Sequence, residues 1–134
     1  MDPALLQALR SLHSPSDWVH FGTIGKDGGP HVTPLMMGVR DPWLLFSLTG
    51  KQKVRNLERD PRACVSISRP GSMAHVIVWG RVVLRTDDEA QALWEEMITR
   101  AFGADGLGAR ARRLSPEGTQ LGVLTPERHR IYGL

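Results

Sequence analysis

A cluster of positive charge is the strongest chemical signal in this sequence. Lys51, Lys53 and Arg55 fall within five residues, and no acidic residue interrupts them. Pro61 disfavours helix at the residue before it, so the cluster can open a helix over about residues 51–60. A helix start offers free backbone N–H groups, and cationic side chains beside them can close on the same phosphate. This spacing is therefore typical of an anion-binding site.

A solvated face without a ligand is the alternative interpretation of the cluster. Lys51, Arg55 and Arg59 stand at i, i+4 and i+8, where like charges cost roughly 0.2–0.5 kcal/mol per pair. Cations in a first helical turn also oppose the helix dipole, and a bound anion would remove both penalties. A P-loop is excluded, because Leu45 stands where that motif begins with glycine and Gln52 replaces its serine or threonine.

The elements that must position this cluster are mostly strands. Runs rich in β-branched and aromatic residues, separated by Gly, Pro and Asp turns, predict strands over 18–24, 31–39, 43–48, 63–68 and 73–85, and a last strand within 118–134. Gly80 predicts a bulge or a close backbone approach in the fifth strand. Six strands joined mainly by hairpins indicate a small antiparallel barrel of the all-β or α+β class.

Two further helices are predicted. Residues 4–12 form a short amphipathic helix, and apolar residues at 90, 93, 94, 97, 98, 101 and 102 form a long helical stripe. Thr86 and Glu89 have the spacing of a capping box, and Gly103 stands where a glycine ends a helix. The polar, Gly-rich stretch 104–118 is predicted as a connection. Its basic residues Arg110, Arg112 and Arg113 are interpreted as a solvated face, with contact to an acidic cofactor tail as the alternative.

Composition excludes several classes of protein. The 134 residues predict a single domain, 1–134, and no apolar run is long enough for a membrane span. One cysteine, Cys64, and no visible signal peptide predict a cytoplasmic protein. The five histidines lack metal-ligand spacing, so no metal site is expected. A net charge of +3 suits an anionic partner, but no nucleic-acid-binding motif accompanies it, so no nucleic acid is expected.

Four stretches carry a family resemblance: GKDGGPHVTPLMMGV, WLLFSLTGKQKVRNLERDPRACVSI, VIVWGRVVL and the ending TPERHRIYGL. In this order they resemble the pyridoxamine 5′-phosphate oxidase-like family of flavin-binding split barrels. The resemblance covers about residues 18–85 well and the last strand more loosely. It implies a mainly β fold, a six-stranded antiparallel split barrel with Greek-key order. It also implies a homodimer with flavin mononucleotide (FMN), or the deazaflavin coenzyme F-420, at the subunit interface.

The resemblance also implies a role for particular residues. Lys51 and Lys53 would bind the cofactor phosphate, with Arg55 close behind. The second strand would lie along the isoalloxazine ring through His31, Val32, Thr33, Pro34 and Leu35. Trp79 would be a ring neighbour at the interface or a core residue. Asn56 would be structural, capping the helix or tying it to the barrel.

The chain departs from true pyridoxamine phosphate oxidases at its end. Those enzymes end with an aromatic-rich segment and an Arg-x-His pair that hold the substrate, whereas His129 and Arg130 stand here in HRIYGL. We therefore do not expect vitamin B6 oxidation. The first hypothesis is an oxidoreductase that moves hydride to or from a small organic substrate on a flavin-type ring, with no side chain identified as acid or base. The alternative is a non-enzymatic flavin- or haem-binding carrier or sensor.

Overall fold

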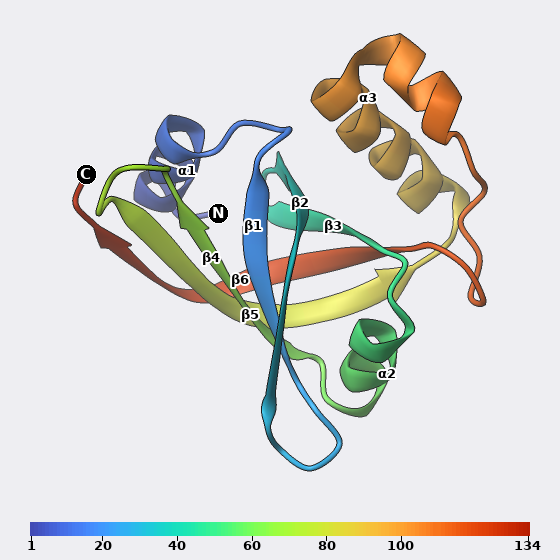
Figure 1. Ribbon diagram of the computed structural model, residues 1–134, viewed down its shortest axis with the longest axis horizontal. Coiled ribbons are helices and arrows are strands. Elements are labelled where there is room, and N and C mark those ends of the chain that lie inside the picture. The colour runs from blue at the N-terminus through green and yellow to red at the C-terminus, as the bar shows by residue number, and fades with distance from the viewer.

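Six antiparallel strands form a closed barrel in the computed structural model, which describes residues 1–134 (Figure 1). The strands pair in the order β1-β2-β3-β6-β5-β4. Because β4 returns to pair with β1, the first four strands have Greek-key order, as predicted. The strands are β1 (Trp18–Ile24), β2 (Pro30–Arg40), β3 (Trp43–Leu48), β4 (Arg62–Ser68), β5 (His75–Arg85) and β6 (Gln120–Tyr132).

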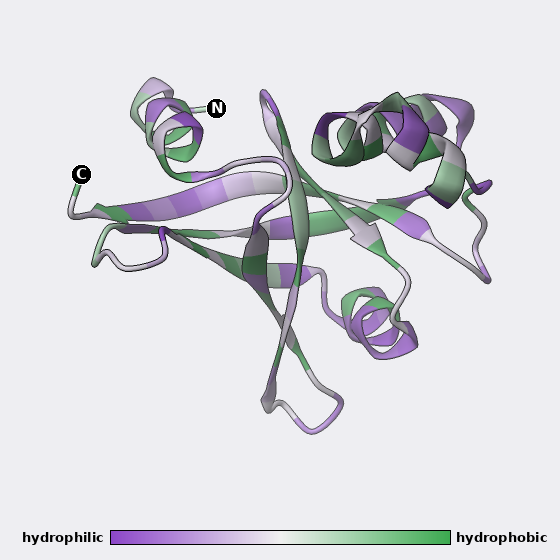
Figure 2. Ribbon diagram, turned by 45° about the horizontal axis from the view of Figure 1, so that its top comes forward, coloured by the Kyte–Doolittle hydropathy of each residue, from purple (hydrophilic) through white to green (hydrophobic).

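Two helices close the two ends of the barrel. Helix α1 (Pro3–Leu12) inserts Leu5 and Leu9 into the barrel core at one end, and α2 (Lys51–Arg59) inserts Leu57. Figure 1 shows the two helices on opposite sides of the strands, with both chain termini near α1. The colouring of Figure 2 shows α2 as largely hydrophilic, which fits a helix that buries few side chains.

The third helix, α3 (Asp88–Arg110), builds a second core outside the barrel. Its Trp94 and Met97 are buried against Leu45 of β3 and Leu121 of β6. The indole Nε1 of Trp94 also donates to Ser47 Oγ at 3.0 Å. Since α3 covers the outside of β3 and the start of β6, the outer faces of β1, β4 and β5 stay uncovered. No helix of the chain is long and apolar enough to cross a membrane.

The structure confirms the predicted irregularity at Gly80. The register between β5 and β6 shifts between Trp79 and Gly80. A Cβ atom on Gly80 would lie 2.2 Å from the Thr125 carbonyl oxygen, so only glycine fits this close approach. The start of the same strand was predicted wrongly, because Met73 and Ala74 belong to the preceding turn and β5 begins at His75.

Two details of α3 differ from the sequence prediction. The capping box is wrong, because Asp87 rather than Thr86 caps the helix, accepting from the Ala90 N–H at 2.8 Å. Gly103 ends the first helical part at φ 76°, but the chain then re-enters helix up to Arg110. Tertiary packing explains this second part: Leu107 contacts the outer core, and the Arg110 guanidinium lies 3.8 Å from the Phe102 ring centroid.

Candidate functional site

The start of α2 is open to an anion. Its N-cap residue, Gly50, offers no side-chain hydrogen bond, and no acidic residue stands in the first turn. The first backbone N–H groups of the helix therefore lack partners within the chain. The Nζ atom of Lys53 would lie 2.7 Å from a Cβ on Gly50, so this ammonium group folds back over the helix start. Neither Lys51, Lys53 nor Arg55 forms an ion pair with a carboxylate.

Two polar atoms of β2 are also without partners. His31 Nδ1 and Thr33 Oγ1 are both buried and form no hydrogen bond. Buried polar atoms in native proteins are nearly always paired, so each such atom indicates a missing partner. His31 lines a cavity of about 540 Å³, together with Gln52 and Asn56 of α2 and the β1–β2 hairpin. His31 of β2 thus lies at the same end of the barrel as α2, and Thr33 follows two residues further along the strand.

Asn56 ties α2 to the barrel at this site. It is fully buried, and its Nδ2 donates to Thr23 Oγ1 at 3.0 Å. Its Oδ1 accepts from Gln52 Nε2 at 2.8 Å and from Arg59 Nη2 at 2.9 Å. These three hydrogen bonds use most of the hydrogen-bonding groups of the Asn56 side-chain amide, and the bond to Thr23 fixes the helix against β1. The predicted structural role of Asn56, tying the helix to the barrel, is therefore confirmed.

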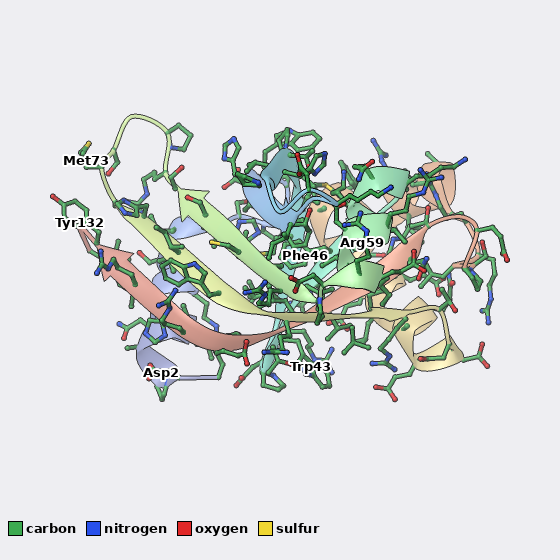
Figure 3. All side chains as sticks on the ribbon, turned by 90° about the horizontal axis from the view of Figure 1, so that it is seen from below. Asp2, Trp43, Phe46, Arg59, Met73 and Tyr132 are labelled. Carbon is green, nitrogen blue, oxygen red and sulfur yellow. The ribbon has the colours of Figure 1, made fainter.

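The structure does not bring all three cations of the cluster to one place. Lys51 and Arg55 line a separate groove between α2 and residues 116–118, whereas Lys53 lies over Gly50. Arg59 turns to Asn56 and does not continue the face of Lys51 and Arg55 as the sequence predicted. Figure 3 shows Arg59 on α2, above the strands. Lys53 is thus the cation that lies over the start of the helix.

The predicted ring-contacting strand divides between two faces. His31 and Thr33 point to the barrel side, where Leu35 is buried in the core with 6% of its surface exposed. Val32 and Pro34 point outward, and Val32 is 60% exposed. Only one face of β2 can contact a given ligand with side chains, so the other residues could meet it only through backbone atoms.

Trp79 lies on the outer surface of β5 and belongs to neither core. The Arg128 guanidinium covers its ring at 4.2 Å from the centroid. Cys64 is its cross-strand neighbour on β4. Burial raises the pKa of the Cys64 thiol, although the Arg128 charge opposes this rise. The thiol is consequently protonated at neutral pH and is not prepared for nucleophilic chemistry.

Sequence reasoning missed Thr23 and Gln52. Thr23 stands opposite His31 in the β1–β2 register and is buried. Only the register could have revealed it, because a threonine in a strand is unremarkable by itself. The basic run after α3 has partners within the chain: Arg113 pairs with Asp88 and Arg112 donates to Thr119. These contacts favour a structural role for the run.

Comparisons with known proteins agree with this fold. The family described as pyridoxamine 5′-phosphate oxidase matches residues 5–132. The chain therefore belongs to this family. A search of curated proteins finds no match.

Solved structures with the same fold have low sequence identity. An F-420 reductase is 22% identical, with a TM-score of 0.69, and the match covers 91% of this chain and 94% of that one. A conserved hypothetical protein from Mycobacterium tuberculosis is 22% identical, with a TM-score of 0.77 over 98% and 84% of the two chains. A protein of unknown function from Agrobacterium tumefaciens is 24% identical, with a TM-score of 0.77 over 99% and 57%.

Proposed function

We propose that this protein is an oxidoreductase that binds FMN, or the deazaflavin F-420, and moves hydride to or from a small organic substrate. The observation that carries the proposal is the open, cationic start of α2, together with the unpaired Nδ1 of His31, which shares a cavity with Gln52 and Asn56 of α2. A phosphate fits the first feature, and a ring with polar edges, or its ribityl chain, fits the second. Membership of the family and the fold of an F-420 reductase support the same cofactor class.

The chain's own residues would bind and orient the cofactor. The N–H groups of α2 and the Lys53 ammonium would hold the phosphate, with Lys51 and Arg55 adding positive potential from the neighbouring groove. His31 Nδ1 and Thr33 Oγ1 would meet polar atoms of the cofactor. When bound, the flavin or deazaflavin ring supplies the hydride chemistry. No side chain of the site is assigned as acid or base.

Dimerisation is part of the proposal. Strands β1, β2 and β6 expose Trp18 (65%), Val32 (60%) and Tyr132 (53%), respectively. Figure 3 shows Tyr132 close to the exposed Met73 at one edge of the molecule. A second copy of the chain is the commonest partner for such an apolar face. Sedimentation equilibrium at micromolar concentration with cofactor present should give a dimer, and a monomer would contradict this part of the proposal.

The test of the function is a spectrum followed by a titration. Freshly purified protein should show the absorption bands of oxidised flavin or of deazaflavin, whereas a haem band would favour the carrier hypothesis. In fluorescence titrations, FMN should bind much more tightly than riboflavin, which lacks the phosphate.

Salt dependence adds an independent check on the ligand. Two or three charges meeting one phosphate give a shallow decrease of affinity with salt. A nucleic-acid site with six to ten phosphate contacts would lose roughly a thousandfold or more between 50 and 200 mM salt. Steep salt dependence with equal affinity for FMN and riboflavin would overturn the proposal.

A further inference from the structure

A second cavity lies between α1, the end of β2 and α3, away from the start of α2. It has a volume of about 230 Å³. Leu9 on its wall belongs to the barrel core, whereas Leu93 and Met97 belong to the outer core. The cavity therefore lies where the two cores meet without filling the space between them. We call it the α1–α3 pocket.

The mouth of this pocket carries excess positive charge. Arg10, Arg40 and Arg100 line it, against the carboxylates of Glu96 and Asp41. Asp41 is already paired with the Met1 amino group at 3.0 Å. Three guanidinium groups thus remain for the single carboxylate of Glu96.

The geometry around Glu96 shows what kind of group the arginines accept. Glu96 Oε2 accepts from Arg40 Nη1 at 2.6 Å, and its Oε1 lies 2.8 Å from Arg100 Nη2. Arg10 has no carboxylate partner in the chain. The guanidinium fork matches the two oxygens of a carboxylate, so a second carboxylate would complete the arrangement at Arg10.

A buried polar atom at the same pocket also lacks a partner. His13 lines the pocket, and its Nε2 lies 2.8 Å from the Met37 carbonyl oxygen, which can only accept a hydrogen bond. Nε2 therefore carries the proton. The other ring nitrogen, Nδ1, is buried and unpaired. As an acceptor, Nδ1 needs a hydrogen-bond donor, which a carboxylate does not supply, so the arginines and not this atom select the charge of a ligand.

We propose that the α1–α3 pocket binds a small amphipathic carboxylate, with its apolar body between Leu9, Leu93 and Met97 and its carboxylate at Arg10. The volume leaves room for roughly eight water-sized groups. A singly charged head group is favoured over a phosphate, because α1 presents the negative end of its dipole here and no helix start offers N–H donors.

Binding of the carboxylate does not depend on the proposed function. Only its identification as the substrate of the oxidoreductase rests on that function. Strand β2 connects the two sites, since His31 and Thr33 lie at its beginning and Gly38 and Val39 at the pocket. At about 3.3 Å per residue, Thr33 and Gly38 are roughly 17 Å apart along the strand. The two sites therefore lie along the same strand.

Binding can be tested without cofactor. Isotope-labelled apo-protein is titrated with hexanoate, hexanamide and hexylamine, which share one apolar chain and differ in charge, and backbone NMR shifts are followed. Hexanoate should bind about tenfold more tightly than hexanamide, and hexylamine most weakly. The shifts should concentrate at α1, at the end of β2 and at the middle of α3. Equal affinity for hexanoate and hexanamide, or shifts elsewhere, would overturn the proposal.

Two variants should change hexanoate affinity in opposite directions. Arg10→Gln removes the free guanidinium and should weaken hexanoate roughly fivefold, leaving hexanamide unchanged. Glu96→Gln releases Arg40 and Arg100 and should strengthen hexanoate by roughly the same factor. Arg110→Gln, which removes an equal charge outside the pocket, is the control and should have no effect. Equal responses of all three variants would refute the site. FMN affinity, measured separately, shows whether the proposed function fails on its own.

Discussion

Two helices of this barrel begin in opposite ways. Helix α3 begins at Asp87, whose carboxylate accepts from the Ala90 N–H, and Asp88 and Glu89 fill its first turn. Helix α2 begins at Gly50, which has no capping side chain, and its first turn holds Lys51 and Lys53. The positive end of the helix dipole is therefore satisfied within the chain at α3, and is left open, with further positive charge, at α2.

This difference separates a helix start built for stability from one suited to a ligand. At α3, hydrogen bonds from Arg85 and from the backbone N–H of Ala90 hold the pKa of Asp87 at about 2. At α2, the stabilising anion has to come from outside the chain. The apo-protein accordingly lacks a contribution at α2 that a bound phosphate would supply.

The largest expected effect concerns Lys53. Lys53→Ala should weaken FMN binding by about 1.5–3 kcal/mol, because a charge-assisted contact to the phosphate is lost. The stability of the apo-protein should stay constant, since Lys53 has no ion-pair partner there. Arg55→Ala should have a smaller effect on FMN, because Arg55 faces the neighbouring groove. Fluorescence titration and urea unfolding measure the two quantities. An unfolded apo-protein with unchanged FMN affinity would show that the cluster is structural.

The next effect concerns the bond that fixes α2 on the barrel. Asn56→Ala should lower the free energy of unfolding by about 1–3 kcal/mol, because it leaves the buried Thr23 hydroxyl without its partner. Urea denaturation measures this change. Glu58→Ala, on the exposed side of the same helix, is the control and should change stability by less than about 0.5 kcal/mol. Equal effects of the two substitutions would contradict the tethering role.

A smaller effect is expected from giving α2 the kind of start that α3 has. Gly50→Asp should stabilise the apo-protein by about 0.3–1 kcal/mol, because a carboxylate is added at the positive helix end. Gly50 has φ −77° and ψ 118°, so an ordinary residue fits, and only the flexible end of Lys53 must move. FMN affinity should fall, since the carboxylate occupies the phosphate position. Gly50→Ala is the control that adds a side chain without a charge. Unchanged FMN affinity in Gly50→Asp would place the phosphate elsewhere.

The smallest effect is a pH dependence at the start of α3. Asp87 has a folded-state pKa of about 2, below its ordinary value of 3.8. A carboxyl group with a lowered pKa stabilises the fold when the pH is above its ordinary pKa. This stabilisation is lost as the pH falls towards the pKa of the folded state. The difference in unfolding free energy between the protein and Asp87→Asn should therefore be constant from pH 5 to 8. It should shrink between about pH 4 and 2. Asp105→Asn is the exposed control, and a difference that persists to pH 2 would contradict the assigned cause.

Much of the architecture could be predicted from the sequence, because local patterns decide local structure. Strands 18–24 and 43–48 were predicted with the bounds that the structure shows, and the helix after Gly50 begins where expected. The alternation of apolar and polar residues, the turn residues and the end of the helix at Asp60-Pro61 can each be recognised from a few neighbouring residues. The cation cluster at α2 belongs to the same class of local information.

Only the tertiary structure decided which of these residues act together. The two-residue period of β2 separates His31 and Thr33 from Val32 and Pro34, but barrel closure determines which pair faces α2. Thr23 enters the site through its register opposite His31, and the second part of α3 forms because Leu107 reaches the outer core. The α1–α3 pocket brings Arg10 and Glu96 together across 86 residues of sequence. Each of these juxtapositions depends on strand pairing and packing between distant segments, which a local pattern does not contain.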